Sequence, residues 1–318
     1  MPDFSKVLKN KHSFQRHNLE QVLSEEDSFP NESETGIYFF DRQCIVRIAN
    51  RLELRKKAYQ LLHRLYSKMG IVPPESNGMW LSIYDALPET TTLLVEDNQG
   101  EIAGALTLVL DSPIGLPADA LYKEEIDRLR SSRRKIGEII SLGINDKTKG
   151  SIKFLACLFY CVYMLSWRSK KLTDFVITVH ARYENFYCRN MLFRKIGVER
   201  NYAKVSNAPT VLLNLPLILP DTLKEKRQVF PLSMLNYSKQ KEREVAKKID
   251  AMSVSMSDEE FYYFFINKTN IWEKATPQQK DCIKKIYPAN QTDHFKVSRA
   301  LARGFSKKNR NTQNINEK

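Results

Sequence analysis

Residues 135–167, KIGEIISLGINDKTKGSIKFLACLFYCVYMLSW, decide the fold of this chain. The apolar segment 135–144 is typical of a buried strand, and a polar turn follows it over 145–150. The long apolar segment 152–168 predicts a helix. Its most apolar run, 154–167, is shorter than the roughly 20 residues that a membrane-spanning helix needs, so we expect a core helix. A buried strand joined to a helix by a short turn indicates an α/β protein.

The segments on either side extend this unit into a larger sheet. Two apolar runs joined by the turn DNQG at 97–100 predict a β-hairpin. The predicted order is strand 36–49, helix 51–69, hairpin strands 91–96 and 101–110, helix 118–130, strand 135–144, helix 152–168, strand 173–179, helix 182–195, and strands 199–204 and 210–215. Mixed connectivity of this kind predicts an α/β fold with a mixed central sheet flanked by helices.

Composition divides the chain into three parts. Residues 1–35 are polar and lack a clear period, so we expect an N-terminal extension. Residues 36–220 hold the predicted sheet, and residues 221–318 are predicted to be a basic helical C-terminal extension. Within that extension the pattern favours helices over 233–250, from 257 through 265, and over 276–286.

Charge and hydropathy limit the class of protein. The chain has 318 residues and a net charge of +13, from 50 Lys and Arg against 37 Asp and Glu. A hydrophobic fraction of 42% supports a globular core and excludes a mostly disordered chain. Residues 221–318 carry a surplus of eight positive charges, and residues 1–220 a surplus of five. This surplus favours an acidic partner: a nucleic acid, an anionic membrane or an acidic protein.

Cysteine usage and the start of the chain predict a cytoplasmic location. The five cysteines are widely spaced and form no C-x-x-C pair, so a disulfide scaffold is not expected. Cys157 and Cys161 share a helix face, but no second pair completes a metal site, and buried packing is favoured. The first 20 residues lack the apolar region of a secretory signal.

Four stretches carry a family resemblance. They are residues 111–118 (DSPIGLPA), 137–144 (GEIISLGI), 183–197 (YENFYCRNMLFRKIG) and 202–213 (YAKVSNAPTVLL). In this order and spacing they resemble long-chain N-acyl amino acid synthases, a family of the GNAT superfamily related in fold to acyl-homoserine-lactone synthases. The resemblance covers about residues 36–216 and implies a GNAT-like fold. It also implies an acyltransferase of lipid biosynthesis that moves a fatty acyl chain from acyl carrier protein to the amine of an amino acid.

The same resemblance places the acyl donor at the turn before the helix 152–168. Ordinary GNAT enzymes bind coenzyme A through a Gly-rich loop, whereas the segment here, KTKGSIKF, has one glycine. This departure fits a donor with a single phosphate, such as phosphopantetheine on acyl carrier protein, with acyl-coenzyme A as the alternative and no permanently bound cofactor. An ordinary helix start capped by Ser151 accounts for the segment equally well. The expected donor contacts are Lys149, Gly150, Ser151, Ile152 and Lys153.

Two residues are candidates for the chemistry. Glu138 is the one carboxylate in an otherwise apolar strand, and burial would raise its pKa and suit it to accept the proton of the acceptor amine. Tyr187 falls where many GNAT enzymes place a tyrosine that protonates the leaving thiolate. The alternatives are a surface-facing glutamate and an aromatic core contact on an amphipathic helix.

The resemblance also implies residues that bind the two substrates. The family commonly has an arginine three residues after Glu138, and Ser141 stands there, which puts the identity of the acceptor in doubt. Asp85 lies where related synthases carry an acid that contacts the acceptor amine. Arg47 and Arg55 flank the first helix, near the regions that bind acceptor and donor. Solvated surface charges explain these three residues as well.

Two other functions fit the charge. The first is a catalytically inactive GNAT-like protein that binds nucleic acid, although KQKEREVAKK mixes in acids, as a solvated helix face does, and no nucleic-acid-binding motif occurs. The second is contact with a membrane surface through the basic C-terminal helices and the cluster FYYFF at 261–265, for which packing onto the core is the favoured explanation. Neither the histidines nor the cysteines predict a metal.

Overall fold

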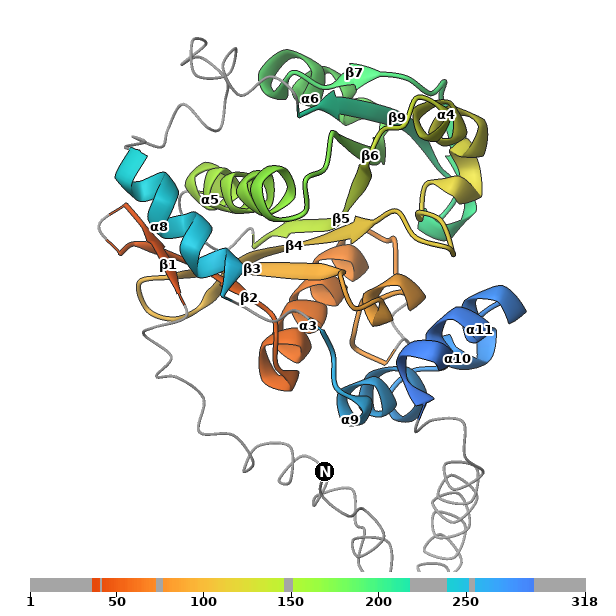
Figure 1. The fold of residues 1–318 in the computed structure, drawn as a ribbon, viewed down its shortest axis with the longest axis horizontal. Helices are drawn as coiled ribbons and strands as arrows, with labels where there is room; N and C mark the ends of the chain where they lie inside the picture. Colours follow the sequence, from red (N-terminus) through yellow and green to blue (C-terminus); the bar gives the residue numbers. More distant parts are fainter. Residues whose placement is uncertain are drawn as a thin grey trace, which may run out of the picture.

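A computed structural model describes residues 36–40, 42–72, 77–145, 151–217, 239–251 and 255–288. These residues form a nine-stranded sheet with helices on its two faces (Figure 1). The strands lie in the order β1-β2-β3-β4-β5-β6-β9-β7, and β8 also pairs with β9. Their bounds are β1 Ile37–Phe39, β2 Cys44–Ile48, β3 Thr91–Asp97, β4 Ile102–Leu110, β5 Ile136–Ile144, β6 Asp174–His180, β7 Arg194–Lys195, β8 Arg200–Tyr202 and β9 Ala208–Pro216. The predicted N-terminal extension lies outside the described residues.

The helices follow the predicted order with some differences at their ends. Their bounds are α3 Leu52–Lys68, α4 Asp119–Ser131, α5 Ser151–Met164 with a π-helical continuation Leu165–Ser169, α6 Glu184–Met191, α8 Lys239–Asp250, α9 Asp258–Phe261 with a π-helical continuation Tyr262–Asn267, α10 Ile271–Lys274 and α11 Pro277–Ile286. A 3-10 helix, η2, spans Ile83–Ala86. The mixed α/β fold with C-terminal helices is therefore confirmed, and α10 and η2 are additions that periodicity did not predict. No described helix is long and apolar enough to cross a membrane.

Two predicted elements differ from the structure. The strand expected over 36–49 is a hairpin of β1 and β2, because Phe40 and Arg42 take φ of 49° and 67° and turn the chain back. The helix expected over 182–195 is wrong at its C-terminal end. It stops at Met191, because Leu192 adopts the left-handed conformation with φ 60°, and the next residues form β7 beside β9.

The sheet changes character between β5 and β6. Strands β1 to β5 pair antiparallel with their neighbours, whereas β5 and β6 run parallel. Their pairing covers only Ile136 to Glu138 of β5 and Asp174 to Val176 of β6. Beyond these residues β5 continues beside β4 and β6 beside β9, so the two strands separate. We call this region the β5–β6 separation: residues 139–144 of β5 and 177–180 of β6.

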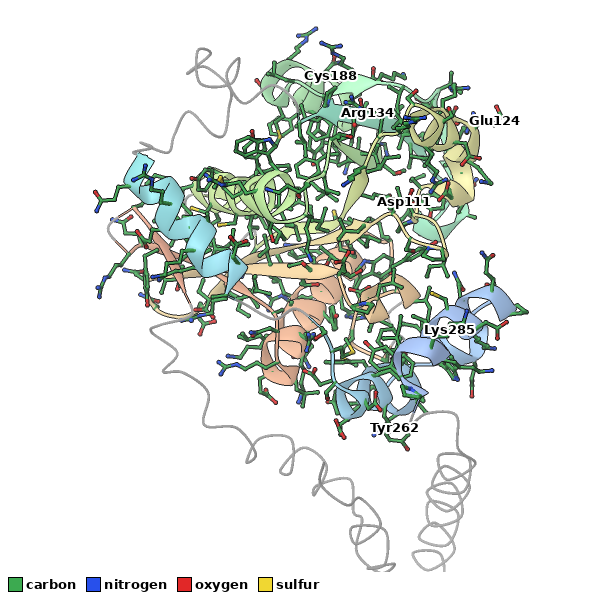
Figure 2. The ribbon with its side chains drawn as sticks, in the orientation of Figure 1. Asp111, Glu124, Arg134, Cys188, Tyr262 and Lys285 are labelled. Atoms are coloured by element: carbon green, nitrogen blue, oxygen red, sulfur yellow. The ribbon has the colours of Figure 1, made fainter. Side chains whose placement is uncertain are left out.

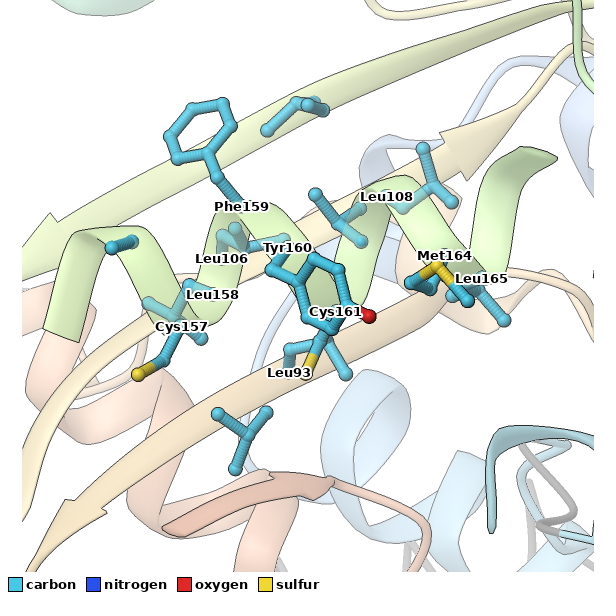
Figure 3. Close-up of a cluster of buried hydrophobic side chains, with 14 of the residues drawn as sticks. Leu93, Leu106, Leu108, Cys157, Leu158, Phe159, Tyr160, Cys161, Met164 and Leu165 are labelled. Atoms are coloured by element: carbon cyan, nitrogen blue, oxygen red, sulfur yellow. The ribbon is translucent and has the colours of Figure 1, made fainter. Parts of the chain in front are cut away.

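One face of the sheet packs against α5. Side chains of β3 and β4, including Leu93, Leu106 and Leu108, meet the apolar surface of α5 (Figure 3). Helix α8 adds Val245 and Ile249 to the same cluster. Because α5 lies between the sheet and α8, nearly all of its surface is buried, which explains its unbroken apolar sequence. The same cluster contains the buried side chains of Leu110, Ile139 and Phe154.

The opposite face carries α3, α4, η2 and the helices α9 to α11. Val109, Ile136 and Val176 point to this side, where they join a second cluster that includes Tyr84 and Tyr122. Phe261, Phe264 and Phe265, from the sequence FYYFF, are buried in that cluster. They therefore pack onto the core, which was the favoured explanation for this aromatic sequence. The C-terminal helices thus extend the cores on both faces of the sheet. The predicted boundary near residue 220 lies outside the described residues.

Candidate active site

Glu138 lies in the middle of the sheet, at the point where β5 and β6 separate. It pairs with Val109 of β4 on one side and with Val176 of β6 on the other. Its side chain is almost completely buried, with 2% of its surface exposed. Its Oε2 accepts a hydrogen bond of 2.7 Å from the backbone N–H of Ala118, and the Thr178 hydroxyl lies 3.5 Å from Oε1. The alternative of a surface-facing glutamate is therefore wrong.

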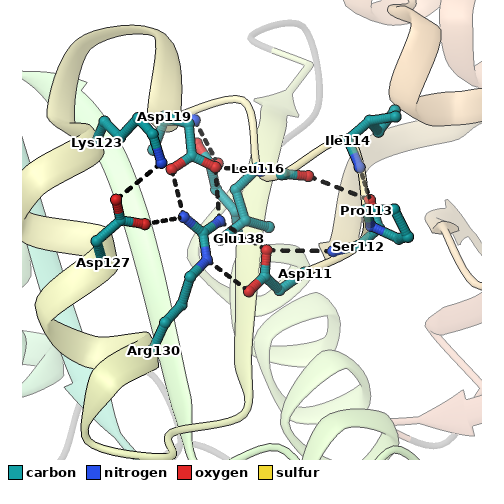
Figure 4. A network of polar contacts seen from close by, with 12 residues as sticks. Asp111, Ser112, Pro113, Ile114, Leu116, Asp119, Lys123, Asp127, Arg130 and Glu138 are labelled. Atoms are coloured by element: carbon teal, nitrogen blue, oxygen red, sulfur yellow. Dashed lines mark hydrogen bonds and ion pairs between the residues drawn. The ribbon is translucent and has the colours of Figure 1, made fainter. Parts of the chain in front are cut away.

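The N–H group that holds Glu138 comes from the DSPIGLPA loop, residues 111–118. Arg130 of α4 holds both ends of this loop, because its guanidinium donates to the carboxylates of Asp111 and Asp119 (Figure 4). Asp119 in turn accepts the N–H of Leu116 at 2.6 Å. A third carboxylate, Asp127, joins the group at 2.7 Å. These carboxylates raise the pKa of Arg130, so the cation that organises the loop is permanent.

Two tyrosines that the sequence did not single out stand near Glu138. Tyr84 of η2 donates to the carbonyl oxygen of Leu116 at 3.3 Å, and Tyr202 of β8 donates to that of Pro117 at 3.5 Å. Burial, together with the charge of Glu138, raises the pKa of each to about 12. Both phenols are therefore neutral at physiological pH, and both tie the 111–118 loop to its neighbours. For Tyr202 the sequence offered one signal, because this residue is the first of the 202–213 motif.

Ser141 marks a bulge in β5, three residues beyond Glu138. The register with β4 shifts between the pairs Thr107–Ile140 and Ala105–Gly143, and Ser141 takes a φ of 54°. The Ser141 hydroxyl accepts a hydrogen bond of 3.1 Å from the indole N–H of Trp80. A short, uncharged serine side chain that is bound by an indole N–H thus occupies the position where the family commonly has an arginine.

Aromatic side chains gather beside this bulge. The rings of Tyr66 and Trp80 meet edge to face at 5.0 Å, and Tyr66 donates to the Leu142 carbonyl oxygen at 3.2 Å. Burial raises the pKa of Tyr66, and the electrostatic influence of Tyr187 adds to that rise, which indicates that the two phenols lie near each other. Tyr66 and Trp80 are further residues that sequence analysis missed.

Tyr187 extends from α6 toward this aromatic group. Its ring packs edge to face on Phe186 and Phe193, and it joins the partly buried surface of the first cluster. Burial raises the pKa of Tyr187 to about 12. A neutral phenol in this position can donate a proton, and it also makes the aromatic contact that was the alternative explanation.

Asp85 does not lie exposed beside an acceptor. Its side chain is buried and caps η2, where it accepts hydrogen bonds from the N–H and the hydroxyl of Ser82 at 2.7 and 2.9 Å. Burial, only partly offset by these bonds and one with Tyr59, raises the pKa of Asp85 to about 6. The cap explains why an acid stands at this position, and acceptor binding by Asp85 remains a prediction.

The two arginines predicted near the substrates are held by carboxylates of the same chain. Arg47 donates to Glu96 at 2.9 Å, and both side chains are about 10% exposed. Arg55 contacts both carboxylate oxygens of Glu260 and the Ser255 carbonyl oxygen. The structure therefore brings neither arginine to Glu138 as a solvated charge. Arg134, which is labelled in Figure 2, lies just before β5 and is likewise paired with a carboxylate, that of Asp174.

The predicted donor residues are only partly described. Lys149 and Gly150 lie outside the described residues, and Ser151 and Ile152 begin α5 with side chains that are not described. Lys153 donates to the Gln43 side chain at 3.3 Å, and its ammonium group lies 5.2 Å from the centre of the Phe154 ring. Across the described part of the chain, no group of His, Cys, Asp and Glu side chains could hold a metal ion.

Comparison with solved structures finds similar chains, of which three are described here. The N-acyl amino acid synthase FeeM from uncultured soil microbes is 19% identical, with 60% of this chain and 97% of that chain covered and a TM-score of 0.49. TofI, in a ternary complex with an inhibitor and MTA, is 14% identical over 61% and 97%, with a TM-score of 0.43. The acyl-homoserine-lactone synthase LasI is 22% identical over 55% and 90%, with a TM-score of 0.38. No curated protein sequence matches this chain.

The family that the sequence matches defines the class of protein, which is an N-acyltransferase. The family model of the N-acyl amino acid synthase FeeM matches residues 57–216, half of the chain. The chain therefore belongs to the N-acyl amino acid synthase FeeM family. The match contains Glu138, Ser141 and Tyr187 and ends before the C-terminal helices.

Proposed function

We propose that the enzyme transfers a fatty acyl chain directly from a phosphopantetheine-linked donor to the amine of an amino acid or a similar small acceptor. The observation that carries this proposal is the position of Glu138. It is a buried carboxylate held by a backbone N–H group at the point where two parallel strands separate. A single carboxylate fixed at this point suits the acceptance of one proton from an incoming amine.

The transfer step needs one base and one acid. The amine nitrogen attacks the thioester carbonyl carbon, the N–C bond forms, and Glu138 takes the amine proton directly or through a water molecule. The C–S bond then breaks, and Tyr187 gives its proton to the departing thiolate. The phenol carries its proton at neutral pH, as this role requires, and its pKa of about 12 makes it a weaker acid than a free tyrosine. Exchange with solvent returns the proton from Glu138 to Tyr187.

The donor is proposed to enter at the start of α5. The N–H groups of Gly150, Ser151 and Ile152 would bind its phosphate, with Lys149 or Lys153 supplying the opposite charge. Acyl carrier proteins are acidic, so the net charge of +13 supports a carrier protein as the partner, with acyl-coenzyme A as the alternative donor. Five free cysteines support a reducing, cytoplasmic setting.

The acceptor is proposed to differ from that of relatives that carry an arginine after the glutamate. Ser141 offers a hydroxyl already bound by Trp80, and it has no charge to pair with a carboxylate. Asp85, Arg47 and Arg55 remain proposed substrate contacts, and each would have to exchange its present partner for the substrate. The acceptor carboxylate would therefore depend on weaker, neutral hydrogen bonds near the bulge.

The test is transfer by the purified protein. Acyl carrier protein loaded with a long acyl chain is mixed with single amino acids, and the products are identified by mass spectrometry. Glu138→Gln should lower kcat/KM by about 100-fold or more, because the amide accepts the Ala118 N–H bond but cannot take a proton. Glu89→Gln, at an exposed carboxylate, is the matched control. Equal kcat/KM for Glu138→Gln and the parent would remove Glu138 from the mechanism.

Absence of transfer to every amine, together with salt-dependent binding to nucleic acid, would favour the alternative function, a catalytically inactive protein that binds nucleic acid.

A further inference from the structure

Residues 255–288 form a helical segment outside the part of the chain that defines the family. The segment contains α9, α10 and α11, which lie together beside α3 in Figure 1. Five of its aromatic side chains are buried in the second cluster, on the face of the sheet that carries Glu138: Phe261, Tyr263, Phe264, Phe265 and Tyr287. The segment is therefore part of the structure around the site.

The segment is attached to α3 by both charge and aromatic packing. Glu260 accepts from Arg55, and the side chains of this pair are 9% and 4% exposed. The ring of Phe264 meets that of Tyr59 edge to face at 5.2 Å. A buried ion pair with an aromatic contact next to it permits one orientation of the segment on α3, because a shift would leave two buried charges unpaired.

From this position the segment contacts two stretches of backbone near Glu138, which are the end of η2 and the 111–118 loop. The Tyr287 hydroxyl donates to the Ala86 carbonyl oxygen at 2.8 Å, at the end of η2. The Gln278 side-chain amide donates to the Pro113 carbonyl oxygen at 2.9 Å, in the 111–118 loop. Helix α11 and Tyr287, the residue that follows it, thus hold both η2 and the 111–118 loop.

Each of these loops has a direct contact at the candidate site. The 111–118 loop supplies the Ala118 N–H that binds Glu138. The η2 helix supplies Tyr84, whose hydroxyl binds the same loop at Leu116 and whose pKa is raised in part by Glu138. A displacement of either loop would therefore change the surroundings of the Glu138 carboxylate, where the acceptor amine must arrive.

We propose that residues 255–288 are a positioning element for the acceptor side of the site, and that Gln278 and Tyr287 are positioning residues that act through the 111–118 loop and η2. The proposal rests on the proposed function, since it takes the acceptor to be a small amine that binds next to Glu138. The C-terminal helices lie outside the residues that the family model matches, and the proposal gives them a role in acceptor binding.

Gln278→Ala and Tyr287→Phe test the proposal with little risk to folding. Gln278 is exposed, and phenylalanine keeps the buried ring of Tyr287. We expect each variant to raise the KM for the acceptor about fivefold and to leave the KM for the acyl donor and the melting temperature nearly unchanged. Gln240→Ala, an exposed glutamine on α8, is the matched control and should change none of these. A purely structural role would lower the melting temperature without a selective effect on the acceptor KM.

Hydrogen–deuterium exchange gives a second readout that does not depend on catalysis. Gln278→Ala should speed exchange of the amides in 113–118, and Tyr287→Phe should speed that of 84–87. Unchanged exchange in both segments, or an unchanged acceptor KM in both variants, overturns the proposal. If the parent protein transfers no acyl group to any amine, the proposed function fails, and faster exchange in the variants would still establish the positioning of the loops.

Discussion

Asp85 shows how burial changes the meaning of a single acidic residue. The family resemblance marks it as a contact for the acceptor amine, whereas its carboxylate caps η2 from a buried position. Burial raises its pKa from 3.8 to about 6. The folded chain therefore binds more protons at this site than the unfolded chain between these two values, and the contribution of Asp85 to stability falls as the pH rises through them.

The Asp85→Asn variant should remove this pH dependence. Between pH 4.5 and 7.5 we expect the free energy of unfolding of the parent to fall by about 2 kcal/mol relative to that of the variant. The asparagine side chain can still accept the Ser82 N–H, so the cap is kept while the titrating group is lost. Urea denaturation of both proteins at the two pH values measures the difference. If the free energy of unfolding changes equally for both proteins between the two pH values, the raised pKa of Asp85 is contradicted.

At the scale of elements, charge holds the two ends of the 111–118 loop together. Arg130, on α4, is bound by Asp111 and Asp119 at the two ends of the loop and by Asp127 on its own helix. The side chain of Arg130 is 25% exposed, so the ion pairs are only partly screened by solvent. The planar, forked donor groups of arginine match two carboxylates at once, which a lysine ammonium cannot do.

Arg130→Lys should therefore destabilise the fold although it keeps the positive charge. We expect a loss of about 2 kcal/mol in the free energy of unfolding, the range for charged hydrogen bonds that lose their geometry. Arg128→Lys is the matched control, since Arg128 is exposed on the same helix, and it should cost less than about 0.5 kcal/mol. Equal urea midpoints for the two variants would show that the network does not hold the loop.

At the scale of the whole molecule, a buried ion pair joins α3 to the C-terminal helices. Arg55 and Glu260 are 205 residues apart in the chain. Glu260 also accepts the Ser257 N–H at 3.0 Å as part of the capping box of α9. The pair therefore connects the start of α9 to the first turn of α3, and its two buried charges compensate each other.

Glu260→Gln should be strongly destabilising, because it keeps the cap of α9 but removes the carboxylate that contacts the buried guanidinium of Arg55. We expect a loss of about 3 kcal/mol in the free energy of unfolding, and recovery of most of it in the double variant Arg55→Met with Glu260→Gln. Glu259→Gln, at the exposed neighbour, is the control. Urea denaturation of the parent, Glu260→Gln, Arg55→Met and the double variant gives the coupling energy. A double variant less stable than Glu260→Gln would show that the charge of Arg55 is not the cause.

The order of helices and strands in residues 52–180 was predictable from the sequence because it depends on local pattern. The hairpin β3–β4, the helices α3, α4 and α5, and the strands β5 and β6 all lie where hydrophobic periodicity and turn residues place them. The end of α6 was not predictable in the same way. Leu192 has no preference for a left-handed conformation, and the helix ends there because β7 pairs with β9.

The sequence by itself determined the class of fold, the family and the two chemical candidates, Glu138 and Tyr187, because motif and local period carry that information. Only the tertiary structure decided which partners each residue has. It placed Thr178 and Ala118 on Glu138, Trp80 on Ser141 and Glu260 on Arg55. The physical reason is that these contacts join segments between 20 and 205 residues apart, and such contacts are selected by the packing of the two cores and by the need of buried charges for a partner.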